Sequence, residues 1–221
     1  MSNEIQLSGV IKIGKLEHLQ KLQSKGMLFL NNLKYYREIE SKEKYLRKDV
    51  LEGSSSHINL TILQLFDGLK EIPFKFKSGH LNQYVPENLK HHVFCLYGIK
   101  SEILNSRPFI GTELIQFGDS ALIITDIDEF INRINNKLKL LKFDCKMGFV
   151  NYYDPSKDHP NLTPFDKPNY YEYQNEIRLL VMGHPKPTLE IEIGSICDIS
   201  VIVDSNDLLK LTIETEELEN K

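Results

Sequence analysis

The chain has 221 residues, of which 41% are hydrophobic and 26% are charged, so it can bury a hydrophobic core that needs no disulfides or bound metals to stabilise it. Its 27 basic and 31 acidic residues give a net charge of −4, which argues against a protein that coats nucleic acid through a general excess of positive charge. No window approaches the roughly 20 apolar residues of a membrane span, and the first residues lack a signal-peptide pattern. We therefore expect a cytoplasmic protein with no membrane segment, folded as a single domain over residues 1–221.

The first thirty residues predict a strand, a helix and a second strand. Residues 9–13 are β-branched and alternate weakly, whereas the leucines of residues 15–24 recur at near-helical spacing. Gly26 is expected to end this helix before the apolar run of residues 27–30. Residues 31–57 are polar and mixed, so we expect a long, partly mobile loop with some helix.

The middle of the chain alternates between apolar runs and one strongly periodic segment. Three runs predict strands at residues 57–66, 92–99 and 121–125. Asp126 is then expected to cap a helix over residues 126–142, in which apolar residues recur at offsets of three, four, seven, eleven and fourteen. This is the clearest helix that the sequence predicts.

The last third of the chain returns to strand patterns. Strands are expected at residues 145–153, 170–182, 189–193 and 196–203, and the chain is expected to fray from Glu214. The loop at residues 154–168 contains four prolines, which restrict its conformations, so we expect a semi-rigid rim that frames a substrate. Short strands combined with two strong helical periods predict an α+β fold with a bent, split antiparallel sheet and few helices.

The most informative pattern lies in the expected strand over residues 170–182. Because side chains alternate along a strand, Gln174, Glu176 and Arg178 would share one face. An amide, a carboxylate and a guanidinium in a row after a proline-rich loop are typical of a ligand site. The same pattern also fits an ordinary surface ion pair, worth under about 1 kcal/mol. The core face would carry Tyr173, Ile177, Leu179 and Val181.

The Gln174-x-Glu176 spacing resembles the Q/E-x-E motif of the ADP-ribosyltransferase superfamily, and the opening strand, helix, glycine and strand resemble that superfamily's first unit. The layout is similar to bacterial and phage proteins with G-x-L-x-F, Y-x-R and K-P-x-Y-x-Y-Q-x-E-x-R segments, here residues 26–29, 36–37 and 167–178. The resemblance implies an ADP-ribosyltransferase-like fold that uses NAD as co-substrate. It also implies transfer of ADP-ribose to RNA or protein, as in phage-defence toxins, with an antitoxin or inhibitor protein as a partner.

The same resemblance implies roles for individual residues. Glu176 would stabilise the oxocarbenium-like transition state, and Gln174 would orient the acceptor. Lys12 stands near the place of the family's His or Arg for the NAD ribose or phosphate, and a lysine is a point charge, not a bidentate fork. The rings of Tyr35 and Tyr36 would either stack on nicotinamide or pack under the loop.

Arg178 completes the expected NAD-binding set and would also keep the glutamate ionised and fixed.

The alternative function is a catalytically silent protein of the same fold that binds a protein or nucleic-acid partner. Residues 1–50 support it, because they hold ten Lys and Arg against six Asp and Glu. Only five arginines occur in the chain, which weakens a nucleic-acid partner.

Other kinds of site have weaker support in the sequence. Neither a G-x-x-x-x-G-K-[ST] loop nor a G-x-G-x-x-G motif is present, which excludes common ATPases and dehydrogenases. Adjacent histidines such as His91 and His92 point to opposite faces of a strand, so we expect no metal site. A cleft that Glu176 shares with Tyr36, Lys12 and Gln174 would favour the enzyme, whereas a flat open strand would favour the binding protein.

Overall fold

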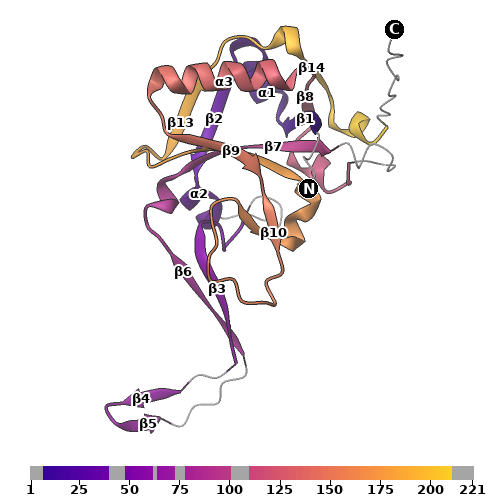
Figure 1. Cartoon of the computed structure of the whole chain (residues 1–221). Helices are drawn as coiled ribbons and strands as arrows, with labels where there is room; N and C mark the ends of the chain where they lie inside the picture. Colours follow the sequence, from indigo (N-terminus) through magenta and orange to yellow (C-terminus); the bar gives the residue numbers. More distant parts are fainter. Residues whose placement is uncertain (1–6, 40–47, 62–63, 73–77, 101–109, 211–221) are drawn as a thin grey trace, which may run out of the picture.

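The computed structural model describes residues 7–39, 48–61, 64–72, 78–100 and 110–210, so the expected fraying from Glu214 lies outside it. At its centre is an eight-stranded sheet in which all strand pairs are antiparallel (Figure 1). Its strands are β1 (Leu7–Gly14), β2 (Met27–Asn32), β7 (His92–Lys100), β8 (Ser120–Ile124), β9 (Cys145–Phe149), β12 (Glu176–Val181), β13 (Thr188–Glu192) and β14 (Ser200–Asp204). The strand order is β13-β2-β7-β1-β8-β14, and β12 lies between β7 and β9.

The sheet is split beside β7. Strand β12 pairs with residues 92–97 of β7, so β1 and β2 share the opposite edge of that strand. Strand β2 pairs there only with His92 and Val93, and the pairing with β1 starts at Tyr97. Residues 94–96 therefore face a gap between β1 and β2. The fold is α+β with a split antiparallel sheet, in agreement with the expected class.

Two helices cover one face of the sheet, α1 (Leu16–Lys25) and α3 (Ile127–Leu141) (Figure 1). Gly26 ends α1 in the left-handed region at φ 63°, and a Cβ there would lie 2.0 Å from the Gly194 carbonyl oxygen, so only glycine fits. No helix in the described part of the chain is long and apolar enough to cross a membrane. The helices contribute Leu19, Leu22, Phe130, Ile134 and Leu138 to the main core.

Asp126 caps α3 as the sequence predicted: its carboxylate accepts a hydrogen bond of 2.9 Å from the Glu129 amide. We expect Asp126→Ala to destabilise the protein by about 1 kcal/mol, which would lower the melting temperature by about 2–4 °C in a chain of this size. Thermal denaturation measures the loss. Asp126→Asn keeps an acceptor oxygen and is the control, so an equal loss in both variants would contradict the capping role.

The opposite face of the sheet is covered by short helical turns. The 3₁₀ helices η3 (Leu114–Phe117) and η6 (Ser205–Lys210) lie over β1, β7 and β8, where Leu114 and Leu208 pack against Ile11 and Tyr97. Near the other end of β7, α2 (Leu33–Glu38) follows β2 directly. Leu33 of α2 packs with Val93 and Leu180 in a further apolar cluster. We call it the third cluster, after the main core and the cluster around Ile11 and Tyr97.

A hairpin arm projects from the body of the protein (Figure 1). It consists of β3 (Ser54–Leu60) paired with β6 (Gly79–Tyr84), and its far end carries β4 (Leu65–Asp67) paired with β5 (Lys70–Ile72). The predicted strand at residues 57–66 is therefore shifted and interrupted. The short helix η1 (Asn88–Lys90) leads from the arm into β7.

The predicted strand at residues 170–182 is only half correct. Its first part is the 3₁₀ helix η4 (Asn169–Gln174), which ends at Asn175 in the left-handed region with φ 35°. Tertiary contacts override the strand propensity of the tyrosines here, because Tyr171 is buried and its hydroxyl donates to the Lys48 carbonyl at 2.6 Å. The predicted strand at residues 196–203 likewise begins with a 3₁₀ helix, η5 (Cys197–Ile199).

The proline-rich loop lies between β10 (Asn151–Tyr153) and β11 (Asp166–Pro168), which pair in parallel. It is docked on β3. His57 and His159 exchange main-chain hydrogen bonds of 2.8 and 2.7 Å, and the Leu162 amide donates to the Ser55 carbonyl at 2.8 Å. These contacts hold the loop against the base of the arm, and its role as a substrate rim stays a prediction.

Candidate functional site

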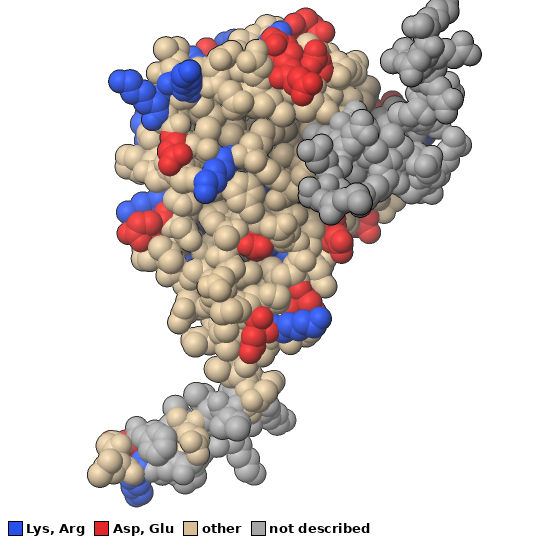
Figure 2. Space-filling model, viewed as in Figure 1, with Lys and Arg blue, Asp and Glu red and all other residues tan. Residues whose placement is uncertain are grey.

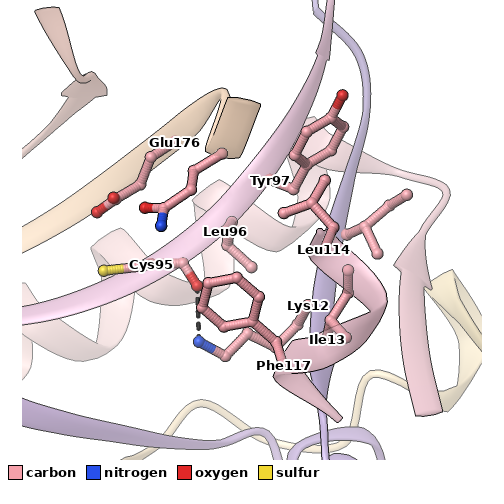
Figure 3. Close-up of a pocket in the computed structure, with 10 residues that line it drawn as sticks. Lys12, Ile13, Cys95, Leu96, Tyr97, Leu114, Phe117 and Glu176 are labelled. Atoms are coloured by element: carbon pink, nitrogen blue, oxygen red, sulfur yellow. Dashed lines mark hydrogen bonds between the residues drawn. The ribbon is translucent and has the colours of Figure 1, made fainter. Parts of the chain in front are cut away.

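A pocket of about 430 Å³, open space at its mouth included, lies at the split in the sheet (Figure 3). Its polar lining comes from Lys12 of β1, Gln174 of η4 and Glu176 of β12, and these three are among the site residues predicted from the sequence. The remaining lining residues are Ile11, Ile13, Cys95, Leu96, Tyr97, Leu114 and Phe117.

Glu176 is the first residue of β12 and is only 4% exposed. Its Oε1 accepts from Arg178 Nε at 2.5 Å, and its Oε2 accepts from Lys167 Nζ at 3.0 Å. Burial alone raises the pKa of this carboxyl, but the two cations lower it more, so its pKa lies well below the ordinary value. The glutamate is therefore ionised, and the interpretation as an ordinary surface ion pair is wrong because both partners are buried.

Arg178 lies deeper than the glutamate and does not line the pocket. Its Nη1 and Nη2 donate to the two carboxylate oxygens of Glu52 at 2.8 and 2.9 Å, which is the bidentate geometry that suits a guanidinium. Nη1 also donates to the Pro164 carbonyl of the proline-rich loop. Arg178 thus contacts Glu176 from behind the pocket wall, and this position does not match its predicted place in the NAD-binding set.

Gln174 reaches the site by a different route from the one predicted. It does not share a strand face with Glu176, because it ends η4 and the left-handed turn at Asn175 separates the two. Its Oε1 accepts from Lys167 Nζ at 2.8 Å, and its Nε2 donates to the Tyr173 hydroxyl at 3.1 Å. The Gln174 amide and the Glu176 carboxylate are therefore connected by Lys167, which donates a hydrogen bond to each of them.

Lys12 extends from β1 across the gap in the sheet (Figure 3). Its Nζ donates to the Cys95 carbonyl at 2.7 Å and lies 4.5 Å from the centre of the Phe94 ring. The ammonium thus occupies the edge of β7 that neither neighbouring strand covers. This places a positive charge in the pocket lining.

Tyr35 and Tyr36 lie on α2, and neither ring lines the pocket. Tyr35 is 42% exposed, and its ring meets that of Tyr36 edge-on at a centroid distance of 5.3 Å. Tyr36 packs against the third cluster, where burial raises the pKa of its hydroxyl. Of the two roles left open by the sequence, packing is the one that matches the position of Tyr36.

Cys95 contributes a protonated thiol to the site. Burial and the nearby charge of Glu176 raise its pKa to about 12. A thiol with this pKa is a poor nucleophile at neutral pH. As for metals, the described residues contain no group of three or more His, Cys, Asp or Glu side chains placed to hold an ion.

Three charged residues of the site were assigned no role from the sequence: Asp49, Glu52 and Lys167. Each is less than 7% exposed. Asp49 and Glu52 lie in a polar segment whose pattern predicts a loop, so no local signal marked them as buried. With Glu176 and Arg178 they form a cluster of three carboxyl groups and two cations, which we call the buried charge cluster. Of its members only Glu176 lines the pocket.

Asp49 makes the stability of the protein depend on pH. Burial and the repulsion from Glu52 raise the pKa of Asp49 to about 7, above its value of about 3.9 in an unfolded chain. A carboxyl group whose pKa is raised in the folded state destabilises the fold when it ionises. The free energy of unfolding therefore starts to fall near pH 4, where the unfolded chain loses this proton, and stops falling above pH 7, where the folded protein has lost it too. We therefore expect the free energy of unfolding of Asp49→Asn to exceed that of the wild type by up to a few kcal/mol between pH 5 and pH 8.

Urea unfolding of both proteins at pH 5, 6, 7 and 8 measures this gain. Asparagine keeps the oxygen that accepts the 2.9 Å hydrogen bond from the Leu51 amide, so the comparison isolates the charge. A stability difference between Asp49→Asn and wild type that stays constant over this pH range would show that Asp49 does not titrate as described.

The fold and the site together define an α+β protein with a pocket at the split of its antiparallel sheet. Comparison of the chain with protein-family models, curated proteins and solved structures finds no match. Its function therefore has to follow from the chemistry of this pocket.

Proposed function

We propose that this protein transfers ADP-ribose from NAD to a macromolecular acceptor, RNA or protein, at the pocket that contains Glu176. The observation that carries the proposal is an ionised carboxylate next to an amide in the lining of a pocket at the sheet split. Breaking the bond between nicotinamide and ribose develops positive charge on the sugar, as in other glycosyl transfers. A fixed carboxylate stabilises such a charge where it develops.

The lining of the pocket fits parts of NAD. Tyr97, Leu114 and Phe117 supply an apolar and aromatic wall that suits a flat heterocycle. The ammonium of Lys12 supplies a positive charge that suits a phosphate or the polar edge of a ribose. In this proposal Glu176 stabilises the ribose cation and Gln174 orients the incoming acceptor group.

The biological role that we propose is that of a toxin or phage-conflict effector. An enzyme that modifies RNA or protein at the expense of NAD would harm the cell that makes it. An antitoxin or inhibitor protein that covers the pocket would be the expected partner.

The test uses the purified full chain with NAD labelled in its adenylate half and a cell lysate as the source of acceptors. Released nicotinamide is quantified, and nuclease or protease digestion assigns the label to RNA or to protein. We expect transfer by wild type and by Glu172→Gln, a matched change at an exposed position of η4. If the wild type neither binds NAD nor releases nicotinamide, the proposal is wrong.

A catalytically silent binding protein is the second candidate, and one observation favours it. Both oxygens of Glu176 already contact buried cations, which offsets part of the charge that catalysis would use. Its partner would more readily be a protein than a nucleic acid. On the face that Figure 2 shows, the coloured Lys and Arg side chains lie in small groups interspersed with Asp and Glu.

A further inference from the structure

Lys167 contacts both of the side chains to which we assign catalytic roles, and it does so from a separate element. It lies in β11 at the end of the proline-rich loop and is 6% exposed. Its Nζ is 2.8 Å from Gln174 Oε1 and 3.0 Å from Glu176 Oε2, and it lies 4.5 Å from the centre of the Tyr171 ring. One ammonium group thus joins an amide, a carboxylate and an aromatic face.

This bridge orients the amide of Gln174. An ammonium can only donate hydrogen bonds, so the oxygen of the amide must face Lys167 and its nitrogen must point away. The nitrogen accordingly donates to the Tyr173 hydroxyl at 3.1 Å. The ammonium therefore selects one of the two orientations of the amide, the one with its oxygen toward Lys167.

The same bridge fixes the carboxylate of Glu176. Lys167 contacts Oε2 while Arg178 contacts Oε1, so each oxygen has its own cation and the carboxylate cannot rotate without losing one of them. Burying a lysine is expensive, and an apolar side chain of similar size would often stabilise a core as well or better. A buried lysine at this position is therefore better explained by orientation than by stability.

We propose that Lys167 is a positioning residue that sets the orientation of the Gln174 amide and, together with Arg178, holds the carboxylate of Glu176 ionised and fixed. The proposal rests on the proposed function only in calling these two side chains the reacting groups. The positioning itself is a property of the protein without any substrate.

The test is Lys167→Met, which keeps an unbranched side chain one atom shorter and removes its charge, with Lys146→Met at an exposed position of β9 as the matched control. Carboxyl ¹³C resonances of labelled glutamate, assigned with Glu176→Gln, follow the titration of Glu176. Loss of a cation in direct contact should raise the midpoint of this titration by about one pH unit or more. The side-chain amide resonances of Gln174 should also shift, and the control should change neither.

An unchanged Glu176 titration in a folded Lys167→Met protein would overturn the proposal. If this variant does not fold, the wild type still decides, because a buried, hydrogen-bonded ammonium should give a slowly exchanging ¹⁵N resonance. That resonance should shift in Gln174→Ala, and its absence from the wild-type spectrum would also overturn the proposal. Failure of the wild type to cleave NAD would instead refute the proposed function, since none of these spectra requires NAD.

Discussion

Replacing Glu176 with glutamine is expected to lower ADP-ribosyl transfer by a factor on the order of one hundred or more. Glutamine keeps the shape of the side chain and removes the negative charge that the proposed mechanism places next to the ribose cation. Binding of NAD should survive, because the apolar wall and Lys12 are untouched. The assay is label transfer at saturating NAD, together with a binding titration.

The structure adds an effect on stability that the sequence did not predict. On an open strand, Glu176→Gln would leave folding nearly unchanged, but here the change leaves Arg178 and Lys167 buried beside a neutral group. Breaking a buried ion pair from one side destabilises by about 3–5 kcal/mol, and the remaining amide oxygen should keep the loss near the lower end. The melting temperature should therefore fall along with activity.

Loss of activity through unfolding has to be separated from loss of the charge. Leu179→Ala removes buried volume from the core face of the same strand and should cost about 2–5 kcal/mol without touching Glu176. Below its melting temperature this control should keep its transfer activity per folded molecule, whereas Glu176→Gln should not. Full activity in Glu176→Gln would refute the catalytic role of the carboxylate.

The largest loss of stability is expected from Arg178→Met. Its guanidinium is 1% exposed and contacts both Glu52 and Glu176, so the change leaves two carboxylates without their principal cation. Removing one side of a buried ion pair costs about 3–5 kcal/mol, and here two pairs share the arginine. We expect a protein that is mostly unfolded, or a melting temperature well below that of any other variant proposed here.

A double-variant cycle tests the reason for this loss. Adding Glu52→Gln to Arg178→Met should restore part of the stability, because one of the two unpaired charges is removed as well. Arg133→Met is the matched control: this arginine makes bidentate contacts with Asp198 at the surface, and its replacement should cost much less. Equal losses at Arg178 and Arg133, or strict additivity in the cycle, would contradict the role of the buried charge cluster.

The sequence by itself determined the elements whose signals are local. The helical period of α3, its cap at Asp126 and the end of α1 at Gly26 each depend on residues within one or two helical turns, and all three are present as predicted. The alternation of Ile177 and Leu179 likewise placed one face of β12 in the core. Repeated apolar spacing is enough for such features, because the helical and strand periods depend only on the local backbone.

The tertiary structure alone decided the nature of the site. Arg178 meets a carboxylate 126 positions away, at Glu52, and nothing in the periodicity of the polar segment around Glu52 reports such a contact. Asn175 turns Gln174 off the strand because packing of Tyr171 against the segment near Lys48 outweighs the strand propensity of the tyrosines. Whether an ion pair is a weak surface contact or a buried support depends on its distance from water, and only the packed fold sets that distance.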